Sequence, residues 1–326
     1  MKNVTKKRAS LNRINYAGSL EPVVERLGKF FKIGQVQDYL VIDIGYGDCN
    51  VIVKTNKGKF LAKIFQKERT QQNIVRYVKI MQKVLEAGVK HPFLVKNQLG
   101  KIIFYDRHFS GLKLVLMDYI EGKTLYELNR KPNSNELKKI VEQTAKINSI
   151  SYRPSYIFDS WAIPNIGRIF NNTKKFIDRS DLPLIERVIK RFNIIPINLL
   201  PKCFVHGDLT KTNVLKSDNG DIYILDFSIA NWYPRIQELA VIITNLLYDE
   251  HESSNLKEKS ELIIKEYGKF KRLTTEEHKW LYDYSLAALA MEILGALQEK
   301  YINNNDTEET DYLLKLGRVS LRREFN

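Results

Sequence analysis

The first third of the chain consists of short runs in which apolar and polar residues alternate, with two segments of helical periodicity between them. Apolar residues at helical spacing predict an amphipathic helix over 21–31 and a second over 74–85. Gly88 would end the second helix, because glycine readily adopts the left-handed backbone of a helix C-terminus. The short runs predict strands over 39–44, 50–54, 59–65, 102–105 and 114–117. This part is therefore predicted to form an antiparallel sheet with helices.

From residue 118 onward the pattern is mainly helical. Its periodicity predicts helices over 134–149, 182–192, 237–247, 256–267, 275–298 and 308–318. A sheet-rich part followed by a helical part is typical of an α+β fold. We predict two lobes of one unit, 1–117 and 118–326.

Net charge changes at the same place. The 326 residues include 52 Lys+Arg and 38 Asp+Glu, a formal net charge of +14. Residues 1–117 hold 22 of the basic and 8 of the acidic residues, so the entire excess lies there and the remainder balances at 30 and 30. A basic chain can bind nucleic acid, phosphate or a membrane surface. Because the excess is confined to the predicted first lobe, we interpret it as compatible with nucleotide binding and do not expect nucleic acid as a partner.

Other global features favour a globular protein of a reducing compartment. Cys49 and Cys203 are too few for a disulfide framework. The first 16 residues are polar and basic rather than signal-like, and the apolar run at 239–248 is interrupted by Thr244 and Asn245. We expect a cytoplasmic protein with no membrane segment. The sequence contains no indication of oligomeric state.

The segment 204–215 combines polar residues with apolar flanks. His206, Asp208 and Asn213 lie in a loop between apolar segments, and the short apolar strand 222–225 ends at Asp226. Any one of these residues would be explained by local hydrogen bonding in a turn. The set is more specific, because transfer of a phosphoryl group to a hydroxyl needs a carboxylate to accept the hydroxyl proton and oxygen ligands for Mg²⁺. Asp208 suits the first role, and Asn213 and Asp226 suit the second.

This loop resembles the catalytic loop of the aminoglycoside phosphotransferase and choline kinase superfamily, with Gly207 where protein kinases have arginine. The resemblance covers almost the whole chain. It implies a two-lobed, protein-kinase-like fold that binds ATP or GTP and Mg²⁺ in the cleft between the lobes. It also implies that His206 braces the loop and that Glu238, where the family usually has aspartate, supports it.

Upstream segments agree with the resemblance. Glycines between two strands allow backbone N–H groups to approach phosphates, and a lysine flanked by apolar residues in a strand needs an anionic partner. The segment 114–122 resembles the hinge whose backbone would face the nucleotide base. The implied nucleotide-binding residues are Gly45, Gly47, Asn50, Lys63, Asp118 and Ile120.

One departure concerns the partner of Lys63. The family pairs this lysine with a mid-helix glutamate, expected near Arg76 and Tyr77, whereas the acids of this segment are Glu68 and Glu86 at its ends. Glu68 or Gln72 are possible substitutes. The missing glutamate motivates an alternative, a nucleotide-binding regulator without catalysis.

The substrate is predicted to be a small molecule with a hydroxyl group. Glu238 follows Asp226 by only twelve residues, which leaves no room for a long activation loop, and no Ala-Pro-Glu sequence follows. Glu292, beside small residues, and Asp159 are candidates for contacting this acceptor, although either could simply be paired or solvated. A further alternative is a kinase-like ATPase acting beside RNA, because the segment 206–210 also resembles the loop of small ATPases of tRNA-modification complexes.

Overall fold

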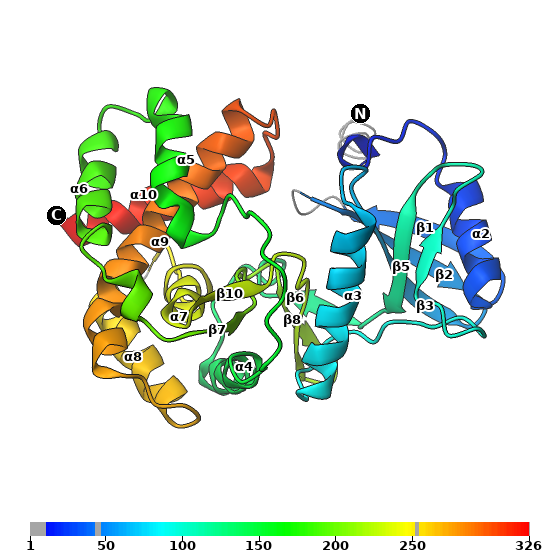
Figure 1. Cartoon of the computed structure of the whole chain (residues 1–326), viewed down its shortest axis with the longest axis horizontal. Coiled ribbons are helices and arrows are strands. Elements are labelled where there is room, and N and C mark those ends of the chain that lie inside the picture. The colour runs from blue at the N-terminus through cyan, green and yellow to red at the C-terminus, as the bar shows by residue number, and fades with distance from the viewer. Residues whose placement is uncertain (1–10, 43–46, 252–253, 326) are drawn as a thin grey trace. The chain divides into compact units, whose positions relative to one another are not determined.

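The structure is a computed structural model that describes residues 11–42, 47–251 and 254–325 (Figure 1). Its internal contacts divide the chain into two compact units. Unit 1 comprises residues 1–85 and 91–121, and unit 2 comprises residues 86–90 and 122–326. The change between the units therefore falls between Glu121 and Gly122, at the end of the predicted hinge segment.

Unit 1 is built on a five-stranded antiparallel sheet with the order β1-β2-β3-β5-β4. Its elements are α2 (Glu21–Phe31), β1 (Val36–Ile42), β2 (Cys49–Thr55), β3 (Gly58–Ile64), α3 (Gln71–Glu86), β4 (Ile103–Tyr105) and β5 (Lys113–Asp118).

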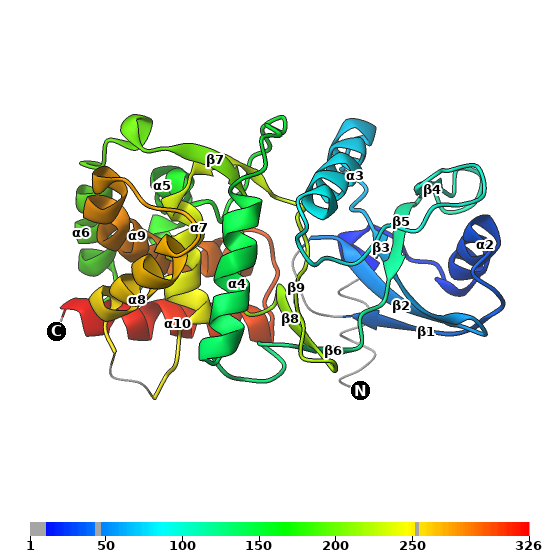
Figure 2. The ribbon, with the colours of Figure 1, turned by 90° about the horizontal axis from the view of Figure 1, so that it is seen from below.

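The two faces of this sheet differ because side chains alternate along each strand. One face carries Val51, Ala62 and Leu116, which pack with Leu27 of α2 in a hydrophobic core. The other face carries Lys63 and Met117, and α3 covers it (Figures 1 and 2). A lysine thus lies on the inner face between the sheet and α3, where water is largely excluded.

Unit 2 is mainly helical. Its helices are α4 (Ser134–Ile147), α5 (Ile166–Thr173), α6 (Leu182–Phe192), α7 (Ile236–Val241), α8 (Leu256–Gly268), α9 (Thr275–Tyr301) and α10 (Glu308–Phe325). The middle of α9 is buried on all sides, as expected for a helix without a polar face. Helices α5, α6, α7, α8 and α10 pack around it (Figures 1 and 2).

Small strands position the polar loops of unit 2. β6 (Gly122–Thr124), β8 (Val214–Ser217) and β9 (Ile222–Ile224) form an antiparallel sheet, and β7 (Lys202–Val205) pairs with β10 (Asn231–Pro234). The segment 206–213 connects β7 to β8, and the segment 225–230 connects β9 to β10. These two connections carry the residues singled out in the sequence.

The predicted α+β class with a sheet-rich first part and a helical second part is confirmed. Several elements differ from expectation, among them two helices of unit 2. The predicted helix over 237–247 is α-helical only to Val241 and continues as a π-helical turn, Ile242–Leu246. Helix α5 was not predicted, because its eight residues are too short for periodicity to stand out.

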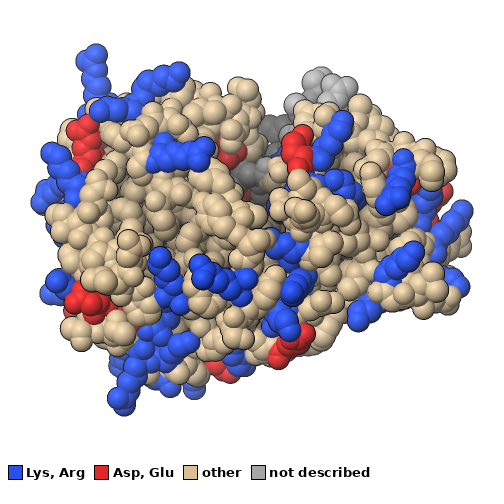
Figure 3. Space-filling model, in the orientation of Figure 1, with Lys and Arg blue, Asp and Glu red and all other residues tan. Residues whose placement is uncertain are grey.

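Two properties of the described residues concern a membrane or a nucleic acid as partner. No described helix is long and apolar enough to cross a membrane. On the face drawn in Figure 3, Lys and Arg side chains are scattered, with other residues between them.

A buried ion pair joins the start of α7 to the start of α9. Arg235 Nε donates to Glu277 Oε1 over 2.7 Å, a second guanidinium nitrogen pairs with Oε2, and Glu277 also completes the capping box of α9 with Thr274. Removing one partner of a buried pair leaves the other charge uncompensated.

We therefore expect Glu277→Ala to lower the free energy of unfolding by about 3–5 kcal/mol, measured by urea denaturation. The control is Glu261→Gln on the exposed side of α8, which should change stability by less than about 0.5 kcal/mol. Equal stabilities of the two variants would contradict this account of the pair.

Candidate active site

His206 holds together the two connections that carry polar residues. Its Nδ1 accepts a hydrogen bond from the Asp208 backbone N–H at 3.1 Å, so its Nε2 carries the proton that is donated to the Leu225 carbonyl at 2.7 Å. The ring is fully buried and packs edge-on against Phe227, with 4.4 Å between ring centroids. Burial lowers the pKa of His206 to about 4, so the imidazole is neutral. Both ring nitrogens are thus hydrogen-bonded to the backbone of these connections.

Asp208 is held by Asn213. The Asn213 Nδ2 donates to the Asp208 backbone carbonyl at 2.9 Å and to its carboxylate Oδ2 at 2.7 Å. Because Oδ2 is bound in this way, the orientation of the carboxylate is fixed and Oδ1 is the oxygen that a hydroxyl can approach. The structure thus brings together two residues that the sequence separates by five positions.

Asp226 reaches the same region by a strained turn. The Leu225 N–H donates to the Asn213 carbonyl at 2.8 Å, and the next residue, Asp226, has a φ of +54°. Residues other than glycine seldom adopt this left-handed conformation, although aspartate tolerates it better than most. The Asp226 carboxylate accepts hydrogen bonds from the backbone N–H and the hydroxyl of Ser228. Ser228, which replaces the glycine of protein kinases, therefore orients Asp226.

Glu238 is hydrogen-bonded to the loop that contains Asp208. Its Oε2 accepts the Gly207 backbone N–H at 3.2 Å, and Gly207 has a φ of +89°, which favours glycine at this position. Burial raises the pKa of Glu238 to about 7, opposed by the N–H groups of Gly207 and His206. Its hydrogen bonds are with the backbone of the segment 206–213.

Several carboxylates surround Asp208. Burial, and then the charges of Asp159 and Asp226, raise the pKa of Asp208 well above its usual range. Glu309 and Glu292 act in the same direction at longer range. Groups with strongly shifted pKa values in one place are characteristic of functional sites. The region around Asp208 is therefore strongly anionic.

Glu292, one of the two acceptor candidates, is linked through Asn245 to the segment 206–213, which contains Asp208. The Asn245 Nδ2 donates to Glu292 Oε1 at 3.3 Å, while its Oδ1 accepts the Lys211 backbone N–H at 2.9 Å. Burial raises the pKa of Glu292 to about 7. Asn245 belongs to the π-helical turn, a distortion that is frequent at functional sites.

Asp159, the second acceptor candidate, begins a turn. Its Oδ1 accepts the Trp161 N–H at 2.9 Å, and burial raises its pKa to about 6. The Trp161 ring in turn packs against Gly295 of α9, where an added Cβ would approach it to 2.5 Å. The small residue at 295 is thus required by packing, and Asp159 is close enough to Asp208 to influence its pKa.

The donor set of this region fits a divalent cation that also binds phosphates. The Asn213 nitrogen is occupied by Asp208, so its amide oxygen can ligate a metal together with the Asp226 carboxylate. Oxygen ligands of these types are those that Mg²⁺ prefers, with phosphate oxygens and water completing the shell.

In unit 1, Lys63 and Asn50 are direct cross-strand partners in the β2–β3 pair. The Lys63 ammonium is buried and forms an ion pair with Asp48, with 3.4 Å between Nζ and Oδ2. Glu68 and Gln72, considered as substitutes for the missing helix glutamate, are both exposed. Gly47 is described and partly buried, whereas Gly45 lies outside the described residues.

The two hinge residues lie at the end of β5. The Asp118 backbone N–H donates to the Phe93 carbonyl at 3.0 Å, so that N–H is occupied. Burial raises the pKa of the Asp118 carboxyl. Ile120 follows in the segment between β5 and β6 and is partly buried.

Three functional candidates escaped the sequence analysis: Asp48, Lys211 and Asn245. Lys211 donates from Nζ to the Tyr248 carbonyl at 2.7 Å, and burial lowers its pKa to about 8. Asp48 could have been found from strand register, because pairing of Asn50 with Lys63 places Asp48 at the end of β3. No sequence signal indicates Asn245, because its contacts depend on the π-helical turn.

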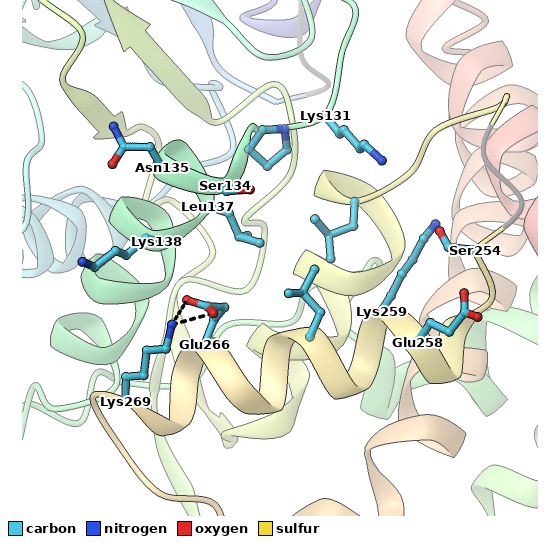
Figure 4. A pocket seen from close by; sticks show the side chains of 13 residues that line it. Lys131, Ser134, Asn135, Leu137, Lys138, Ser254, Glu258, Lys259, Glu266 and Lys269 are labelled. Carbon is cyan, nitrogen blue, oxygen red and sulfur yellow. Dashed lines mark hydrogen bonds and ion pairs between the residues drawn. The ribbon is translucent and has the colours of Figure 1, made fainter.

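A separate hollow of about 610 Å³ lies between the N-terminal part of α4 and helix α8 (Figure 4). Lys131, Lys138, Lys259 and Lys269 line it, and Lys269 is paired with Glu266. None of the site residues discussed above lines this hollow.

Comparison with known proteins gives a family and relatives. The model of the phosphotransferase enzyme family matches residues 38–260. A homoserine kinase of Bradyrhizobium diazoefficiens is 22% identical over 262 residues, which cover 76% of this chain and 75% of that protein. A homoserine kinase of Rhizobium meliloti is 20% identical over 270 residues, covering 80% and 79%.

Solved structures show the same fold at low identity. Spectinomycin phosphotransferase, in complex with ADP and spectinomycin, has a TM-score of 0.67 with 13% identity, covering 93% of this chain and 98% of that one. A microcompartment-associated aminopropanol kinase has a TM-score of 0.68 with 13% identity, covering 91% and 95%. The choline kinase LicA of Streptococcus pneumoniae has a TM-score of 0.65 with 13% identity, covering 93% and 99%.

We expect His206 to remain a neutral imidazole with its proton on Nε2 down to about pH 5.5, because burial opposes its charged form. Ring ¹⁵N chemical shifts of the nucleotide-free protein measure both the charge and the tautomer. Protonation with a midpoint near the ordinary pKa of about 6.5 would contradict the buried hydrogen-bonded arrangement.

Proposed function

Because the chain belongs to the phosphotransferase enzyme family and is a small-molecule kinase with a hydroxyl acceptor, we propose that it transfers the γ-phosphoryl group of ATP to an amino alcohol in a Mg²⁺-dependent reaction. The observation that carries the proposal is the Asp208–Asn213 pair beside Asp226, held by His206. GTP is the alternative nucleotide.

The proposed reaction is a direct in-line transfer. The acceptor hydroxyl oxygen attacks the γ-phosphorus, the bond from phosphorus to the β,γ-bridging oxygen breaks, and ADP leaves. Asp208 Oδ1 orients the hydroxyl and accepts its proton as the bond to phosphorus forms. Asn213 and Asp226 would hold Mg²⁺. The cation, when bound with the nucleotide, would neutralise charge on the phosphate oxygens.

Residues of unit 1 are proposed to bind the nucleotide. Lys63 would contact phosphate oxygens, together with backbone N–H groups of the loop that includes Gly45, Gly47 and Asn50. The Asp118 carbonyl and the backbone of Ile120 would face the base, since the Asp118 N–H is already bound to Phe93.

The anionic surroundings of Asp208 favour an acceptor with a positively charged amine. Asp159, Glu292 and Glu309 all contribute negative potential there. Buried carboxylates with raised pKa values gain stability when a cation approaches. Homoserine, aminopropanol, choline and ethanolamine, named for similar kinases, each combine an amino or ammonium group with a hydroxyl. We propose Glu292 and Asp159 as the acceptor-binding carboxylates.

The Lys63–Asp48 ion pair bears on the alternative of a regulator without catalysis. That alternative was motivated by the missing helix glutamate, and Asp48 supplies a carboxylate to the lysine from elsewhere. On the face drawn in Figure 3, basic side chains are interspersed with other residues, and we keep a role beside RNA only as an alternative.

We expect Asp208→Asn to lower kcat by about 10²–10⁴-fold, because it removes the proton acceptor, and Asp226→Ala to abolish Mg²⁺-dependent turnover. The measurement is ADP release across homoserine, choline, ethanolamine, 1-amino-2-propanol and aminoglycosides, with ATP and with GTP. Asp221→Asn, an exposed change in the neighbouring β8–β9 turn, is the matched control. Full turnover of both site variants on a verified acceptor would refute the assigned roles.

Recognition of the amine gives a second expectation. Glu292→Gln keeps an oxygen for Asn245 but removes the charge, so the KM for an amino-alcohol acceptor should rise by about 10-fold or more, with little change in the KM for ATP. The wild-type KM for the acceptor should rise as pH falls below about 7, where Glu292 becomes protonated, and the variant should lose this dependence. An unchanged KM in the variant would remove Glu292 from the acceptor site.

A further inference from the structure

Lys63 is a buried cation on the inner face of the unit 1 sheet. Its side chain is only 3% exposed, in strand β3 beneath helix α3. A buried ammonium is costly unless an anion and hydrogen-bond acceptors compensate it. The question is which residue provides that compensation.

Helix α3 offers Lys63 an aromatic ring. The Lys63 Nζ lies 5.7 Å from the centroid of the Tyr77 ring, and Tyr77 also packs edge-on against Phe65 and reaches the Met117 sulfur with its hydroxyl. The only acidic residue of α3 is Glu86, at its last position. The helix position that faces the lysine is therefore occupied by tyrosine.

Asp48, immediately before β2, provides the anion. Its side chain is 1% exposed, and its Oδ2 lies 3.4 Å from Lys63 Nζ. Its Oδ1 accepts the Gln66 backbone N–H at 3.0 Å and the Arg69 Nε at 2.9 Å. One carboxylate oxygen is thus fixed by two donors. The other makes no hydrogen bond within the described chain and interacts with the ammonium as an ion pair.

The charge balance of this cluster suits a site for phosphate. Asp48 carries one negative charge, whereas Lys63 and Arg69 carry two positive charges. Among these three described residues the positive charges exceed the negative charge by one. An ammonium has three donors, so Lys63 can bind phosphate oxygens while Asp48 holds it from the other side.

We propose that Asp48 is the positioning residue for Lys63, replacing the carboxylate that kinases of this fold take from the helix. The inference rests on the proposed function, because it assumes that Lys63 binds nucleotide phosphates. Lys63 lies in β3, and Asp48 immediately precedes β2, which pairs with β3 in continuous register from Cys49–Ile64 to Thr55–Gly58. The lysine is therefore held by the sheet itself, and a shift of α3 does not withdraw its partner.

The test compares Asp48→Asn, Lys63→Met and the double variant. Asp48→Asn keeps the shape of the side chain and removes its charge. We expect a KM for ATP raised by about 10-fold, a kcat lowered by a similar factor and an unchanged KM for the acceptor. The double variant should be no worse than Lys63→Met alone, because both changes remove the same interaction. Losses that multiply in the double variant would refute the positioning role.

Arg69→Gln separates positioning from support of the turn. This change removes one donor to Asp48 Oδ1 but leaves the Asp48–Lys63 pair. If Asp48 acts through Lys63, Arg69→Gln should raise the KM for ATP less than Asp48→Asn does, because it removes one of the two positive charges of the cluster but keeps the Asp48–Lys63 pair. An effect as large as that of Asp48→Asn, with the same loss of melting temperature, would mean that Asp48 only supports the turn.

A readout that needs no kinase activity distinguishes failure of this inference from failure of the proposed function. The rate at which an amine-acylating reagent labels Lys63 follows the fraction of neutral amine. Without the Asp48 charge, burial lowers the pKa of Lys63 and labelling should accelerate by about 10-fold or more, quantified by peptide mass spectrometry. Unchanged labelling in folded Asp48→Asn protein would overturn the inference, whatever the protein phosphorylates.

If Asp48→Asn does not fold, the wild-type protein supplies the decisive measurement. NMR of ¹³C-labelled lysine, with Lys63→Arg for assignment, gives the pKa of Lys63 directly. A paired ammonium should titrate at or above its ordinary value of about 10.4, whereas a buried amine without an anion should titrate well below it. Burial and the Asp48 charge act on this pKa in opposite directions, so a value several units below about 10.4 would show that Asp48 does not compensate the burial of Lys63.

Discussion

Charged groups that handle phosphate must be partly withdrawn from water, and every charge withdrawn in this way needs a partner within the fold. This constraint explains the arrangement of both units. In unit 2 the Asp208 carboxylate is held by Asn213, and the loop that carries it is tied to Leu225 and Glu238 through His206 and Gly207. In unit 1 the Lys63 ammonium is held by Asp48. Each partner lies in the same unit as the group it holds.

The two sites differ in the sign of their local charge. Around Asp208 burial and the charges of neighbouring carboxylates raise the pKa of this residue, so the region favours binding of cations. Around Lys63 two cations, Lys63 and Arg69, pair with the Asp48 carboxylate, so the region favours binding of an anion. A nucleotide with its metal and a cationic acceptor would satisfy both excesses. The net charge of +14 is therefore less informative than the local imbalance of each site.

The interior of unit 2 shows how packing restricts the acceptor region. Helix α9 is buried on all sides, and Gly295 and Gly317 allow Trp161 and α10 to approach closely. Asn245 then connects Glu292 of α9 to the backbone of Lys211 in the catalytic loop. A change in the packing of α9 would therefore alter the segment 206–213 through the Asn245 side chain.

The sequence by itself determined the fold class, most element positions and the polar loop, because these depend on local periodicity and on residue types at short spacing. Helix α2 spans Glu21–Phe31 and α6 spans Leu182–Phe192, the ranges that periodicity predicts. In the structure His206 and Asn213 are both hydrogen-bonded to Asp208. The family resemblance added the metal and nucleotide roles, which stay predictions.

Only the tertiary structure determined which group pairs with each buried charge. The partner of Lys63 was sought on the helix, where the family has it, but strand register places Asp48 beside it. The link from Asn245 to Glu292 depends on a π-helical turn in which periodicity predicts a regular helix. Contacts of this kind join residues distant in sequence, and the energy that selects them comes from burial and charge compensation across the whole unit, which no local pattern records.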